Sequence, residues 1–78
     1  MSDTMVIRAE ALFASSLQHS ARPADDMIRR AVAETLALLG TAGCAVNVAG
    51  EFGDHPEAAV SRMRWALATV EGVYALAA

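Results

Sequence analysis

The sequence predicts an all-α protein, a small bundle of about four helices in a single domain over residues 1–78, with the last helix the longest. Three observations lead to this prediction. Apolar residues recur at spacings of three and four, no apolar–polar alternation continues for more than a few positions, and glycine or proline separates the apolar segments. Alanine, the best helix former, supplies much of the 55% hydrophobic content.

The first two helices are expected over about Thr4–Leu17 and from Pro23 to Gly40. Pro23 suits the first turn of a helix, where backbone amides have no partners within the helix. Asp25 and Asp26 are favoured there by the positive end of the helix dipole. Gly40 is a stop signal for the second helix.

A short third helix is expected over Ala42–Phe52 and is ended by Gly53. The fourth is expected to begin at Asp54, whose carboxylate can accept a hydrogen bond from a first-turn amide, while Glu57 returns the bond in a capping box. It is predicted to continue to about Ala77, roughly 34 Å at 1.5 Å per residue.

This last helix carries two apolar patches. One is a seam with steps of four and three that is expected to face the core. The seam consists of Ala59, Met63, Ala66, Val70, Val73 and Ala77. The second patch includes Trp65 and Leu76, and tryptophan is typical of interface hot spots. The residues expected at a homodimer interface are Trp65, Thr69, Val73 and Leu76.

Size and composition also favour self-association. A chain of 78 residues buries only about 60% of its unfolded surface, so small domains usually need a disulfide, a metal or a second copy. Cys44 is the single cysteine, which excludes an intramolecular disulfide. The expected partner is therefore a second copy of the chain, or another protein.

The stretch Val48–Ala66 resembles a helix-turn-helix corner centred on Gly53. Such a motif needs a small residue in its first helix, here Ala49, and a glycine in its turn. The residues Ser61, Arg62, Met63 and Ala66 are similar to those of region four of bacterial sigma factors. This resemblance covers about a quarter of the chain and implies DNA contact through Ser61, Arg62 and Arg64.

Charge argues against that use of the motif. The formal net charge is −3, the six basic residues are all arginines, and Asp54 and Glu57 begin the second helix of the motif. Phosphate contacts require clustered positive charge, so the balance favours protein contact over nucleic acid.

The whole chain also resembles a set of short, uncharacterised all-helical proteins of high-GC bacteria. The resemblance rests on three segments: ALFASSLQ, Ala11–Gln18; GCA, Gly43–Ala45; and GDHPEAAVSRMRWA, Gly53–Ala66. It implies a self-contained helical unit and no particular substrate.

Candidate catalytic and metal-binding residues are few. Apart from the carboxylates they are His19, Cys44 and His55, and their spacing brings together neither three zinc ligands nor a thiolate with an imidazole. A lone cysteine among alanines is usually a small buried residue. We therefore expect no catalytic residues, metal or cofactor.

These observations predict a small helical protein-interaction or regulatory module, non-catalytic and self-associating. The alternative is a small helix-turn-helix DNA-binding or transcription accessory protein. The first residues form no basic leader ahead of an apolar run, and the longest uncharged stretch, Thr35–Gly50, is short and broken by glycine. A cytoplasmic location without membrane contact is expected.

Overall fold

A computed structural model describes residues 2–75 and contains three α-helices and one short 3-10 turn. The helices are α1, Asp3–Ala14; α2, Asp25–Asp54; and α3, Pro56–Tyr74, with the turn η1 at His19–Ala21. No strand occurs among these described residues, so the all-α prediction is confirmed. The expected count of about four helices is not confirmed: the second and third expected segments are joined in α2, which non-helical backbone at Gly40 divides into two halves.

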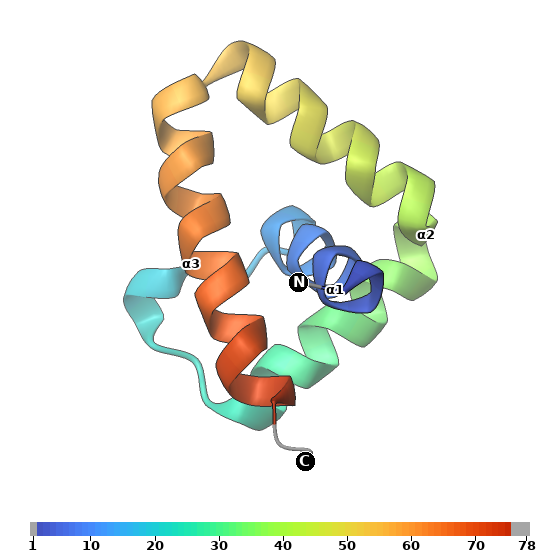
Figure 1. Ribbon diagram of the computed structural model, residues 1–78, viewed down its shortest axis with the longest axis vertical. Helices are drawn as coiled ribbons and strands as arrows, with labels where there is room; N and C mark the ends of the chain where they lie inside the picture. The colour runs from blue at the N-terminus through green and yellow to red at the C-terminus, as the bar shows by residue number, and fades with distance from the viewer. Residues whose placement is uncertain (1, 76–78) are drawn as a thin grey trace.

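The first helix lies in the middle of the molecule. Figure 1 shows α1 almost end-on, with α2 passing along one side and α3 returning along the other. Each pair among α1, α2 and α3 is in contact. α2 spans 30 residues across a break at Gly40, and α3, with 19 residues, is the longest unbroken helical stretch among the described residues.

Gly40 bends α2. Its φ of 73° and ψ of 168° lie outside the helical region, in a conformation that is essentially restricted to glycine. The predicted stop at Gly40 is therefore present as a break in the backbone, and the chain continues into a second helical half, residues 41–54. By length and composition alone, Asp25–Asp54 is long and apolar enough to cross a membrane, and 17% of its most apolar stretch is buried.

Gly40→Ala is expected to destabilise the protein by about 1–3 kcal/mol, because alanine rarely adopts this backbone conformation. A methyl group at this position would meet no atom within 4 Å, so the cost comes from the backbone and not from a clash. Urea unfolding followed by far-UV circular dichroism measures the change.

The control for this substitution is Gly72→Ala. Gly72 is helical and its surroundings are open, so alanine there is expected to stabilise the protein by about 0.4–1 kcal/mol. Equal effects at both glycines would contradict the role assigned to Gly40.

The core is built largely from small residues, which let α1 approach both of its neighbours closely. All three helices contribute to it. The buried residues are Ala9, Ala11, Leu12 and Phe13 from α1; Ile28, Val32 and Cys44 from α2; and Ala59, Ala66, Val70 and Val73 from α3. Four of the six predicted seam residues of α3 are buried, and Met63 packs against them. Ala77 lies outside the described residues.

The predicted capping box at the start of α3 is wrong. Asp54 is the last residue of α2, and α3 begins at Pro56 after the single connecting residue His55, which makes no side-chain capping bond. The amide of Ala59 instead donates to the carbonyl of His55 at 2.9 Å. Gly53 lies within α2, so the connection is tighter than the glycine-containing turn that the sequence predicts.

Asp54→Ala is consequently expected to change the free energy of unfolding by less than about 0.5 kcal/mol, as for most exposed positions. The carboxylate sits at the negative end of the α2 dipole, which further limits what it can contribute. Urea denaturation tests this, and a loss above about 1 kcal/mol, typical of a lost N-cap, would restore Asp54 as a structural cap.

Candidate functional site

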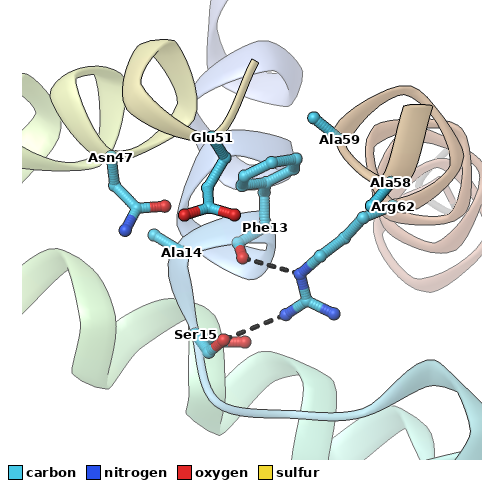
Figure 2. A pocket seen from close by; sticks show the side chains of 8 residues that line it. All are labelled: Phe13, Ala14, Ser15, Asn47, Glu51, Ala58, Ala59 and Arg62. Carbon is cyan, nitrogen blue, oxygen red and sulfur yellow. Dashed lines mark hydrogen bonds between the residues drawn. The ribbon is translucent and has the colours of Figure 1, made fainter. Parts of the chain in front are cut away.

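The most connected polar side chain among the described residues is Arg62 of α3. Its Nε donates to the carbonyl oxygen of Phe13 at 2.9 Å, and its Nη2 donates to the carbonyls of Ser15 at 2.9 Å and Leu12 at 3.3 Å. Figure 2 shows the guanidinium reaching from α3 to the end of α1. The planar group with several fixed donors thus holds one helix against the end of another.

The end of α1 explains this arrangement. The last carbonyls of a helix have no partners within it, and α1 has no basic residue in its last turn. Ser15 supplies part of the cap, since its hydroxyl donates to the carbonyl of Leu12 at 2.6 Å. The charge of Arg62 adds a favourable interaction with the negative end of the α1 dipole.

Aromatic rings surround the guanidinium of Arg62. Its central carbon lies 5.0 Å from the centroid of the Trp65 ring and 5.9 Å from that of Phe13, within the range of cation–π attraction. Burial lowers the pKa of Arg62 below its usual value. Trp65 also contacts His19, with ring centroids 5.8 Å apart, so Arg62 and Trp65 together fix the connection between α1 and α2.

Arg62→Gln is expected to destabilise the protein by about 2–3 kcal/mol, because hydrogen bonds from a charged donor contribute more than neutral ones. Urea unfolding followed by circular dichroism measures this effect. The matched control is Arg64→Gln on the same helix, where the side chain is exposed and the expected change is within about 0.5 kcal/mol. Similar losses for both variants would mean that net charge, and not the cap on α1, is responsible.

A small cavity of about 240 Å³ adjoins Arg62 at the junction of all three helices. Phe13 forms part of it and stacks on Phe52, with centroids 6.1 Å apart and an interplanar angle of 17°. Asn47 and Glu51 of α2 lie across the opening from Arg62 (Figure 2). The cavity is partly open to solvent, and the three hydrogen bonds that Arg62 donates are directed to carbonyls at the end of α1.

Two further arginines link the helices in a similar way. Arg29 near the start of α2 donates to the carbonyl of Val73 at 3.2 Å, near the end of α3. Arg8 of α1 lies over the ring of Tyr74, 4.0 Å from its centroid. Since α3 also has no basic residue in its last turn, Arg29 supplies the positive charge there from another helix.

The residues expected at a homodimer interface lie in different environments. Val73 is 7% exposed and belongs to the core, so it is not a surface residue. Trp65 is half-buried against Arg62 and His19, and Thr69 is also half-buried. Leu76 lies outside the described residues.

The candidate DNA contacts are also divided. Ser61 and Arg64 are exposed, whereas Arg62 is directed inward to α1. Acidic side chains are exposed around the corner between α2 and α3. They are Glu51, Asp54 and Glu57.

The three residues considered for catalysis or metal binding have different surroundings. Cys44 is buried, and burial, with the nearby Glu10 carboxylate, raises the pKa of its thiol. His19 packs on Trp65, and His55 is exposed in the connection before α3. Within residues 2–75, no group of three or more metal-ligating side chains is assembled.

Sequence reasoning missed an exposed apolar surface on α2. In residues 41–54 Cys44 alone is buried, while Val46 is 72% exposed and Leu38, just before the bend, is 82% exposed. We call the side of α2 opposite Cys44 the outer face of α2. It consists of Ala42, Val46, Ala49, Gly50 and Gly53, all exposed. The uncharged stretch Thr35–Gly50 is the signal that could have found it, because a solvent-facing helix side normally carries charge.

The chain matches no protein-family model, no curated protein and no solved structure. The proposals below therefore rest on its own geometry.

Proposed function

We propose that the protein is a small, non-catalytic helical module that acts through protein–protein contact and associates with itself. The observation that carries this proposal is the exposed apolar surface of α2. A helix on the outside of a soluble domain normally shows polar residues to solvent. The outer face of α2 shows alanine, glycine and valine instead, while the polar residues Thr41, Asn47 and Glu51 are exposed elsewhere on the same half of the helix.

The position of this half of α2 makes the surface available. Figure 1 shows residues 41–54 along the outer edge of the molecule, joined to α3 at the corner, with α1 on the inner side only. Contiguous apolar surface of this kind marks interaction sites in soluble proteins. Leu38, before the bend, is also exposed, on the side of α2 that lies near Ser15 and Ser16 at the end of α1.

Charge supports protein contact over DNA contact. The exposed carboxylates of Glu51, Asp54 and Glu57 surround the corner where a recognition helix would begin, and they repel phosphate. Arg62, the central candidate for a DNA contact, already donates to three carbonyls of the α1 end.

Self-association is expected to appear as a concentration-dependent mass. Size exclusion with light scattering over a dilution series should give close to twice the chain mass of 8.2 kDa at high micromolar concentration and should fall toward the single-chain mass on dilution. A single-chain mass at every concentration up to about 1 mM would reject the proposal, since a Kd above this value corresponds to less than about 4 kcal/mol of binding.

A further inference from the structure

We infer that the outer face of α2 binds the same face of a second copy, with the two helices antiparallel and a two-fold axis passing near Val46. This inference rests on the proposed function and adds the surface, the occupant and the orientation. It depends on four features of the described chain. The outer face of α2 lacks charge, two of its glycines have no role in the fold of one copy, its shape is self-complementary, and acidic residues lie at one end of the helix.

The outer face of α2 has no charged residue within it. No acidic or basic side chain occurs between Glu34 and Glu51. Two copies with a net charge of −3 each can therefore approach at this face without placing like charges in contact. Elsewhere along the exposed helix surfaces the carboxylates and arginines are interspersed. Electrostatic repulsion between two copies is therefore lowest at this face.

Gly50 and Gly53 are not explained by the fold of one copy. Both are helical, and a methyl group placed on either would meet no atom within 4 Å. Glycine inside a helix costs about 0.5–1 kcal/mol relative to alanine. Small residues on one helix face allow a second helix to approach closely, so a second helix accounts for both.

The shape of the outer face of α2 is self-complementary. Val46 projects at its centre, and the smaller residues Ala42 and Gly50 lie one turn away on either side. In an antiparallel pair with the axis at Val46, Ala42 of one copy lies beside Gly50 of the other. A two-fold interface requires this reciprocity, because the same patch is used on both sides.

The acidic residues select the antiparallel orientation. Glu51 and Asp54 are both at the carboxyl end of α2. A parallel pair would bring these carboxylates together with their counterparts, whereas an antiparallel pair places them at opposite ends, and it also opposes the two helix dipoles favourably. The same carboxylates disfavour an anionic membrane as the occupant of this face.

The area available predicts a weak dimer. The second half of α2 is about 20 Å long, so its outer face offers less than the roughly 800 Å² per copy of a standard interface. Interfaces at this low end are transient. A dissociation constant in the micromolar range is expected.

Val46→Glu tests the surface, because it places two glutamates against each other at the axis while changing a side chain that is 72% exposed. The dissociation constant of the dimer, measured by sedimentation equilibrium, is expected to rise at least tenfold. The matched control is Ala68→Glu, which adds the same charge at an exposed position of α3 and should leave the dissociation constant within twofold. Circular dichroism of all three proteins verifies that each is folded.

Val46→Cys gives a second, positive test. Two cysteines at the axis should form an intermolecular disulfide under mild oxidation many times faster than those of Ala68→Cys, while the buried Cys44 stays reduced. Equal cross-linking rates for the two variants would overturn the inferred axis.

The outcomes separate this inference from the proposed function. A monomeric wild-type chain overturns both, whereas a wild-type dimer that Val46→Glu does not weaken overturns only the assignment of the surface. Cosedimentation with phosphatidylcholine vesicles, lost in Val46→Glu and retained in Ala68→Glu, would identify a lipid surface as the occupant and overturn the second copy.

Discussion

The hydrogen bonds from Arg62 to the carbonyl oxygens at the end of α1 are the interaction on which the arrangement of the other elements depends. They join two segments 47–50 residues apart in sequence and end α1 at the point where the chain turns toward α2. The same guanidinium contacts Trp65, which packs on His19 in the connection. Arg29 repeats the arrangement at the end of α3. A core poor in large side chains is thus supplemented by charged groups that satisfy the helix ends.

Arginine suits this task better than lysine because its donors are fixed in a plane and one side chain can reach several carbonyls. Its long apolar stem also covers neighbouring rings while the charged end reaches the backbone. The reduced pKa of Arg62 shows that burial opposes the charged form. The charge is retained at this position because an unpartnered helix end would otherwise be partly buried beside it.

Much of the fold could be predicted from the sequence because helix periodicity and glycine breaks act locally. The buried seam of α3 and the break at Gly40 follow from these local rules. The direction in which the second half of α2 continues after Gly40 could not be predicted, since it depends on the backbone angles that Gly40 adopts. The predicted Asp54 cap is wrong for a related reason. Gly53 is a signal for a helix end and Asp54 a signal for a helix start, and two such adjacent signals are compatible with more than one boundary.

The candidate site is harder to predict than the fold. The sequence pattern marks Arg62 as an anion contact, whereas the structure directs it to backbone carbonyls 47–50 residues earlier, a pairing that no local pattern encodes. A helical wheel places Trp65 away from the core and so predicts an interface, but such a wheel does not include the connection containing His19. The outer face of α2 shows the opposite case. The sequence alone shows that this face lacks charge. It does not show that the face is exposed, because the exposure depends on how the bend at Gly40 orients the second half of α2.

The central position of α1 also affects the order in which the chain can fold. Of the three helices, α1 is synthesised before α2 and α3, but its neighbours on one side belong to α3, and its cap is completed only by Arg62. Contacts between distant segments slow folding because the intervening chain must be ordered first. During synthesis α1 therefore remains without its final partners until α3 has emerged. The apolar side of α1 is available to chaperones throughout that interval.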